Sequence, residues 1–240
     1  MNKLKTILFA TCSLVLVTIG TSVKADSSNF AGPYIGISAS GYGLQLAGEA
    51  KTSPTAGAGV KEIDQVSLGQ VAPVTGFEAG YAIPIGSAFL IDIGASMFQG
   101  EAKLEFHDDS AAASGNIEAP VTTTGGAKDV SFTISDLVNY YIAPTLVLSD
   151  TSSLYIKVGL TEADVTVSGD ITSPANLSGT TWALGTRTVL ESGIFIKTEA
   201  GFTDYNGIHA VGKGTSVGSN NSYSADPTVA FGTVALGFRF

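Results

Sequence analysis

The last eight residues of the chain alternate strictly between two kinds of side chain. One face of an extended strand would carry Val234, Leu236, Phe238 and Phe240, and the other Thr233, Ala235, Gly237 and Arg239. A soluble β-sandwich would turn the apolar face toward a core, whereas a transmembrane barrel would turn it toward lipid and keep polar groups inside. The pattern predicts a β-strand, and the rest of the chain must decide between these two settings.

The N-terminus has the organisation of an export signal. Two lysines precede an apolar stretch over 7–19, and small residues follow in Val23-Lys24-Ala25, where a signal peptidase needs them. We therefore expect cleavage after Ala25, with a signal peptide over 1–25 and a mature domain over 26–240. An uncleaved transmembrane anchor is the alternative, but the apolar run is short and no stop-transfer pattern follows.

The mature domain is acidic. The full chain has 12 Lys and Arg residues against 21 Asp and Glu residues. Removing the three lysines of residues 1–25 leaves 9 basic groups against 21 acidic groups, a net charge of −12. Because this charge repels phosphates and offers no basic face, we expect no nucleic-acid partner and no binding to anionic lipid through surface charge.

Strand patterns fill the mature domain, and no apolar run of about 18 residues remains after the signal to form a spanning helix. Most of the expected strands are longer than the usual soluble strand of about 5 or 6 residues. Short turns at 84–87, 149–153 and 191–193 alternate with long polar segments. This order is typical of an all-β fold, an eight-stranded antiparallel up-and-down transmembrane β-barrel with short periplasmic turns and long outer loops. The expected strands are 33–47, 71–83, 89–106, 130–148, 154–167, 180–190, 194–211 and 227–240.

The strand count remains open by two, because the segment 51–70 could contain a short extension. Charged residues on the faces opposite the apolar ones also favour a barrel, since a soluble core would not accept them. An eight-stranded barrel is only wide enough inside for side chains, so we expect these charges to pair with one another and with trapped water in a plugged lumen. The alternative is that some of them are solvated at the rims. The expected interior charge network is Glu78, Asp92, Lys157, Arg187, Lys197, Glu199 and Arg239.

Two segments carry a resemblance to a known family. The opening Ala31-Gly-Pro-Tyr-Ile-Gly36 and the ending, with Thr233, Ala235, Phe238 and Phe240, resemble the small bacterial outer-membrane β-barrel proteins. That group contains the transmembrane domain of outer-membrane protein A and many surface antigens. The resemblance implies a location in the cell outer membrane, contact with its lipids and lipopolysaccharide, and a terminal signal read by the outer-membrane assembly machinery. The family usually has glycine where this chain has Ala235, which leaves the aromatic spacing intact.

Residues for catalysis or metal binding are sparse. The only cysteine lies in the expected signal peptide, the only histidines are His107 and His209, and no catalytic or phosphate-binding motif stands in a suitable context. We therefore expect no enzyme, no cofactor and no metal. One alternative is a hydrolase site at the outer rim, where His107-Asp108-Asp109 and His209 could activate water if their loops converged. Aromatic residues near strand ends favour interfacial girdles over a ligand platform: Tyr81, Trp182, Phe202, Phe238 and Phe240.

The sequence thus predicts a monomeric outer-membrane barrel with a structural or surface-interaction role. Four outward loops would carry whatever specificity exists, with an extracellular ligand that no motif names. The first alternative is a narrow porin-like diffusion channel of the same fold. An outer-membrane hydrolase and a secreted lipocalin-like binder, whose apolar face would point inward, are further alternatives.

Overall fold

The computed structural model describes residues 26–52, 61–106, 130–168, 176–211 and 222–240. These residues are almost entirely β-strand, with two short 3-10 helices, η1 (Ser27–Asn29) and η2 (Glu191–Gly193). No helix in the described part of the chain is long and apolar enough to cross a membrane. The expected signal peptide lies outside the described residues, so its cleavage stays a prediction.

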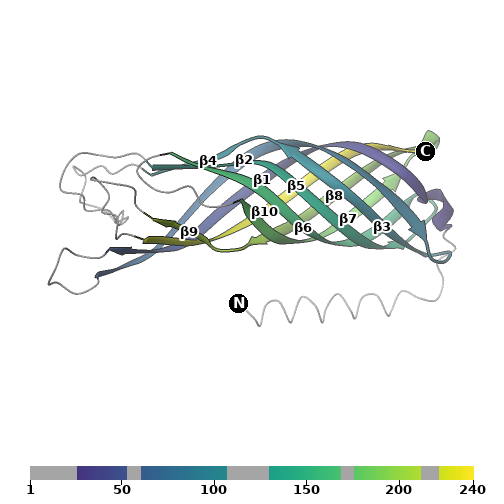
Figure 1. Ribbon diagram of the computed structural model, residues 1–240. Helices are drawn as coiled ribbons and strands as arrows, with labels where there is room; N and C mark the ends of the chain where they lie inside the picture. The colour runs from purple at the N-terminus through teal and green to yellow at the C-terminus, as the bar shows by residue number, and fades with distance from the viewer. Residues whose placement is uncertain (1–25, 53–60, 107–129, 169–175, 212–221) are drawn as a thin grey trace.

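The strands form one antiparallel sheet that closes on itself (Figure 1). The order around the wall is β1-β2-β3-β5-β6-β7-β8-β10, with β4 beside β5 and β9 beside β10. The first strand pairs with the last, for example Ile37 with Leu236. Closure removes the free edges that β1 and β10 would otherwise have. The strands are β1 (Gly32–Thr52), β2 (Lys61–Pro84), β3 (Phe89–Gln99), β4 (Ala102–Phe106), β5 (Val130–Val147), β6 (Ser152–Ser168), β7 (Leu177–Val189), β8 (Ile194–Tyr205), β9 (Ile208–Val211) and β10 (Ser222–Arg239).

Two of the expected strands are interrupted. β4 continues the path of β3 along β5 after a break at 100–101, and β9 continues that of β8 along β10 after a break at 206–207. Gly100 has φ +147°, a backbone conformation that glycine adopts easily and other residues rarely do. Counting each interrupted strand once gives the predicted eight-stranded barrel, so the fold class is confirmed.

The first hairpin is longer than predicted. β1 extends to Thr52 and β2 begins at Lys61, so the extension that the sequence left open is part of these strands. Pairing between β2 and β3 nevertheless ends at Thr75, two residues from Pro73. Proline has no backbone N–H to give to a ladder, which fits its place beside a stretch of β2 that β3 no longer accompanies.

The wall turns its apolar side chains outward. In β10, Leu236 is 51% exposed and Phe238 is 41% exposed, whereas Ala235, the residue before Leu236, is 3% exposed. The same alternation exposes Ile35 and Ile37 in β1. A soluble sandwich or a lipocalin-like binder would bury this face, so the orientation is that of a barrel surrounded by lipid.

Buried apolar clusters lie at both ends of the lumen. Near the short turns, Phe30 and Phe195 belong to one cluster, and near the long connections Leu44 and Phe231 belong to another. Charged side chains lie between the two clusters. Asp92 follows Leu90 of the first cluster by two residues, and Lys197 follows Phe195 by two residues, so each is the next inward side chain along its strand. The polar interior expected from the sequence is therefore only one part of the lumen.

Candidate functional site in the barrel lumen

Three ion pairs cross the lumen and join strands that are not neighbours. Lys197 in β8 binds Glu78 in β2 at 2.7 Å, and Arg187 in β7 binds Asp92 in β3 at 2.7 Å. Lys157 in β6 binds Glu199 in β8 at 2.5 Å. All six residues are at most 9% exposed. Three acids thus neutralise three bases inside the barrel, and each pair spans at least one intervening strand.

Tyrosine side chains surround these ion pairs. The hydroxyls of Tyr34 and Tyr141 lie 2.9 Å apart, and the hydroxyl of Tyr155 donates to Glu199 Oε2 at 3.1 Å. The guanidinium of Arg187 lies 4.7 Å from the ring centroid of Tyr34. These contacts satisfy part of the hydrogen-bonding capacity of the buried charges and add cation–π attraction where water is excluded.

Each tyrosine of this layer lies over a glycine of a neighbouring strand. A Cβ atom added to Gly80 would meet the hydroxyl of Tyr34, and one added to Gly94 would meet that of Tyr141. A Cβ added to Gly185 would likewise meet the ring of Tyr155. The inward glycines therefore make room for the aromatic rings in a lumen too narrow for side chains on every strand.

A row of polar side chains runs along the inner wall on the long-loop side of the charges. Asn139 Nδ2 donates to Thr161 Oγ1 at 2.8 Å. The hydroxyl of Thr181 lies 2.5 Å from that of Thr161 and 2.7 Å from that of Thr203. All four side chains are buried. The row links β5, β6, β7 and β8 by side-chain hydrogen bonds in addition to the backbone ladders.

The outer part of the lumen is apolar. Its buried cluster includes aromatic pairs, such as Tyr42 with Phe98 and with Phe231, each at 5.4 Å between ring centroids. A small apolar cavity lies beside this cluster and reaches Gly100 at the break after β3. Strand alternation does not separate an apolar lumen from a polar one, which is why the sequence did not predict this cluster. The cavity is lined by Tyr42, Leu44, Val74, Gly100, Ile134, Leu137 and Val229.

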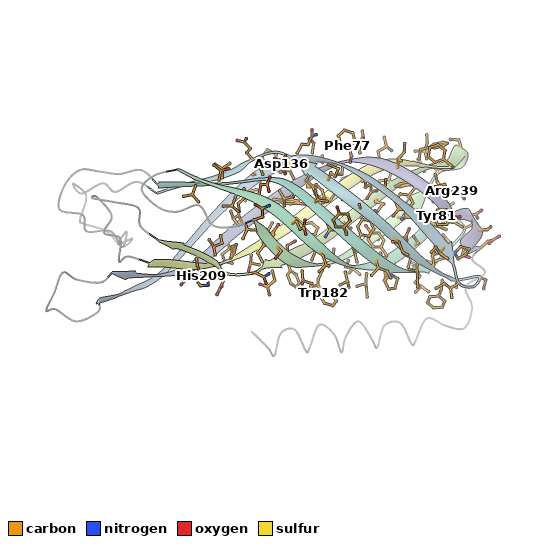
Figure 2. All side chains as sticks on the ribbon, viewed as in Figure 1. Phe77, Tyr81, Asp136, Trp182, His209 and Arg239 are labelled. Atoms are coloured by element: carbon orange, nitrogen blue, oxygen red, sulfur yellow. The ribbon has the colours of Figure 1, made fainter. Side chains whose placement is uncertain are left out.

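Arg239 lies apart from the three ion pairs. Its Nη1 donates to the carbonyls of Ser28 and Ala31 at 3.0 and 3.1 Å, at the short-turn end of the barrel (Figure 2). The structure therefore brings together six of the seven residues that the sequence grouped as an interior network. Arg239 instead holds the segment that precedes β1.

The matching family model describes an outer membrane protein β-barrel domain and covers residues 12–240. The chain belongs to this outer-membrane β-barrel family. The resemblance seen in the sequence and the location in the cell outer membrane are thereby confirmed. In barrels of this family the short turns face the periplasm and the long loops face outward.

Solved structures of similar fold are also outer-membrane barrels. OprG from Pseudomonas aeruginosa is 11% identical, with 91% of this chain and 100% of that chain covered and a TM-score of 0.51. The attachment invasion locus protein Ail of Yersinia pestis is 11% identical, with coverages of 85% and 99% and a TM-score of 0.39. The protease OmpT from Escherichia coli is 8% identical, with coverages of 93% and 100% and a TM-score of 0.48. No curated protein sequence gives a significant match.

The four residues of the expected assembly signal divide between the two faces of β10. Phe238 and Phe240 are exposed, with their rings edge to face at 5.2 Å, while Ala235 is buried in the lumen. The hydroxyl of Thr233 lies 2.8 Å from that of Ser40 in β1, across the seam where the barrel closes. The outward aromatic pair is available to another protein or to lipid, and recognition by the assembly machinery stays a prediction.

The aromatic residues expected in girdles face outward. Tyr81 lies at the same end of the barrel as Arg239, whereas Trp182 lies farther along the wall (Figure 2). Trp182 is paired in register with Phe202 on the neighbouring strand, and both are half-buried among their neighbours. These positions agree with rings placed along a lipid-facing wall.

Only part of the hydrolase site considered from the sequence lies within the described residues. His107, Asp108 and Asp109 lie outside the described residues, and His209 lies exposed on β9 near the long connections (Figure 2). Over the described ranges, no group of three or more His, Cys, Asp or Glu side chains is arranged to hold a metal ion.

Proposed function

We propose that this protein is a non-enzymatic, monomeric outer-membrane barrel with a sealed lumen, and that its role is structural or surface-interactive. Its outward loops would make contacts with an extracellular ligand, while its wall lies among outer-membrane lipids and lipopolysaccharide. The terminal strand would be read by the outer-membrane assembly machinery during insertion. Loops on a rigid scaffold are where binding residues concentrate in proteins.

The observation that carries the proposal is the filling of the lumen. Three paired charges, a row of hydroxyls and two apolar clusters occupy successive levels along the barrel axis. Moving an ion through this stack would require separating buried pairs and then crossing an apolar level, and both steps carry large desolvation costs. This favours a closed barrel over the narrow porin-like channel.

Planar-bilayer conductance tests the sealed lumen. The protein purified from outer membranes should give no steady openings at moderate voltage. Insertion is verified separately by gel mobility with and without boiling, which distinguishes the closed barrel from the unfolded chain. A steady, ion-selective opening from inserted protein would establish the channel alternative and overturn the proposal.

The hydrolase alternative has its own test. Because His107 and His209 are the only histidines of the chain, the variants His107→Ala and His209→Ala remove every imidazole that could act at the outer rim. We expect neither the parent protein nor either variant to cleave phospholipid, lipopolysaccharide acyl chains or peptides. Cleavage by the parent that either variant abolishes would show that the protein is an enzyme.

A further inference from the structure

A short segment before the first strand spans the short-turn end of the barrel. Ser27 donates its backbone N–H to Ser87 at 2.9 Å and its hydroxyl to the carbonyl of Gly86 at 2.6 Å, both in the turn between β2 and β3. Asn29 Nδ2 donates to the carbonyl of Asp150, in the turn between β5 and β6. We call residues 26–31 the strap. It runs from β1 to two turns that belong to other hairpins.

The strap closes this end with a buried side chain. Phe30 has no exposed surface and packs in the cluster that contains Tyr34, Leu90 and Phe195. Arg239, near the end of the last strand, donates to two carbonyls of the strap, as described above. In Figure 1 the purple η1 lies at the same end of the barrel as the C-terminus. The strap is therefore anchored at both sides of the closing seam and across the mouth of the lumen.

Asp26, the first residue of the strap, makes hydrogen bonds through both its backbone nitrogen and its side chain. The backbone nitrogen of Asp26 lies 3.2 Å from Asp150 Oδ1, and the carboxylate of Asp26 accepts the N–H of Ser28 at 2.9 Å. This second bond is the N-cap of η1. The carboxylate of Asp150 thus faces the nitrogen atom that forms the bond to Ala25.

We propose that proteolytic removal of the signal peptide anchors the start of the strap, because it creates an ammonium group on Asp26 that pairs with Asp150. The inference goes beyond the proposed function and rests on cleavage after Ala25. Hydrolysis adds water across the Ala25–Asp26 peptide bond, so Ala25 leaves with a carboxylate and Asp26 keeps a protonated amine. A neutral amide donor becomes a charged donor to the same acceptor.

The new ammonium needs no rearrangement to find its partner, because the Asp26 nitrogen already lies beside the Asp150 carboxylate. The bond to the Asp150 carboxylate already has an ionised acceptor, and cleavage adds a positive charge to the donor, which turns the contact into an ion pair. Exposed ion pairs generally contribute little because two mobile side chains must be ordered. Here the ammonium is on the backbone of a segment already fixed by Ser27, Asn29 and Phe30, so little further ordering is needed.

The N-terminus and its rate of trimming test the proposal. The full chain is expressed with its signal, purified from outer membranes and sequenced from its N-terminus, which should be Asp26. An aminopeptidase is then added to the folded protein, and mass spectrometry follows the loss of residues from the strap. We expect Asp150→Asn to be trimmed about two- to fivefold faster than the parent, the ratio that one exposed ion pair supports. Glu162→Gln, the same chemical change at an exposed position of β6, should be trimmed at the parent rate.

A one-residue extension gives a second variant that needs no change at Asp150. If Ala is inserted between Ala25 and Asp26 and cleavage follows the original Ala25, the new ammonium stands one residue away from Asp150. The aminopeptidase should remove the inserted Ala quickly and then slow to the parent rate at Asp26. Equal rates in Asp150→Asn and the parent, equal acceleration in Glu162→Gln, or an N-terminus other than Asp26 would each overturn the proposal. Conductance plays no part in these readouts, so a failure here is distinguishable from a failure of the sealed lumen.

Discussion

The two halves of the lumen are built on different principles. The half near the short turns combines an apolar cluster with directed contacts, in which Arg187 binds Asp92 and Lys197 binds Glu78 on strands that are not neighbours. The half near the long connections is filled by apolar side chains, and there β3 breaks at Gly100 and the β5–β6 register shifts between Ser135 and Val138. The comparison predicts different costs for substitutions in the two halves.

The largest effect is expected from leaving one buried charge without its partner. Lys197→Met removes the ammonium that binds Glu78, and the buried carboxylate then lacks its hydrogen-bonded cation. Breaking a buried pair in this way costs about 3–5 kcal/mol of unfolding free energy. Urea unfolding in detergent micelles measures the cost. The double variant Lys197→Met with Glu78→Leu should recover most of it, and a double variant as unstable as the single one would contradict the account.

A smaller but clear effect is expected in the apolar half. Leu44 is 3% exposed in the outer cluster, and Leu44→Ala should cost about 2–4 kcal/mol because it leaves a cavity. Leu236→Ala is the control, since Leu236 is 51% exposed on the outward face and its loss leaves no internal cavity. The same urea titration compares the two variants. Equal costs would mean that the two leucines do not differ in burial as the structure has them.

Two glycines of β10 distinguish the cost of crowding inside the lumen from the effect of replacing any glycine in a strand. A Cβ at Gly237 would lie 2.6 Å from the carbonyl oxygen of Ile35 and also meet the ring of Phe195, whereas a Cβ at Gly232 meets nothing within 4 Å. Gly237→Ala should therefore cost about 1–3 kcal/mol by overpacking. Gly232→Ala should be neutral or slightly stabilising, because alanine reduces the freedom of the unfolded chain. Thermal midpoints from heat-modifiable gel mobility would reveal a reversed order if the faces of β10 were assigned wrongly.

The smallest effect concerns the carboxyl group of Asp26, at the start of the strap. The backbone N–H of Ser28, which donates to the Asp26 carboxylate, holds the pKa of that carboxyl below its ordinary value of 3.8. A lowered pKa means that the cap is fully present above the unfolded-state value and is lost as the pH falls through the folded-state value. The amide resonance of Ser28 in micelles should shift with a midpoint below 3.8. In Asp26→Asn that shift should be absent, and a midpoint above 3.8 in the parent would show that the cap is not formed.

The wall could be predicted from the sequence because it depends on local alternation. Leu236 and Phe238 face outward and the short turns fall where proline, glycine and serine mark them, since a strand places every second side chain on the same face. Eight strands follow from the same local signals. Their continuity does not, because the break at Gly100 depends on how β2 and β5 lie beside it.

The contents of the lumen could be predicted only in part. That buried charges would pair follows from their cost, but the choice of partners does not, since Lys197 and Glu78 are 119 residues apart and Arg187 and Asp92 are 95 apart. The strap was missed altogether. A signal for it exists in Asp26-Ser-Ser-Asn29, where an aspartate precedes a short run of residues that favour caps and turns.

The central claim is the orientation of the wall, and spin labels on β10 test it most directly. The mature domain is expected to contain no cysteine, so Leu236→Cys and Thr233→Cys each give a single labelling site. In lipid vesicles, collisions with dissolved oxygen, which concentrates in the bilayer, should relax the label at position 236 strongly and the label at position 233 weakly. Strong relaxation at 233 with weak relaxation at 236 would place the apolar face inside and contradict the account.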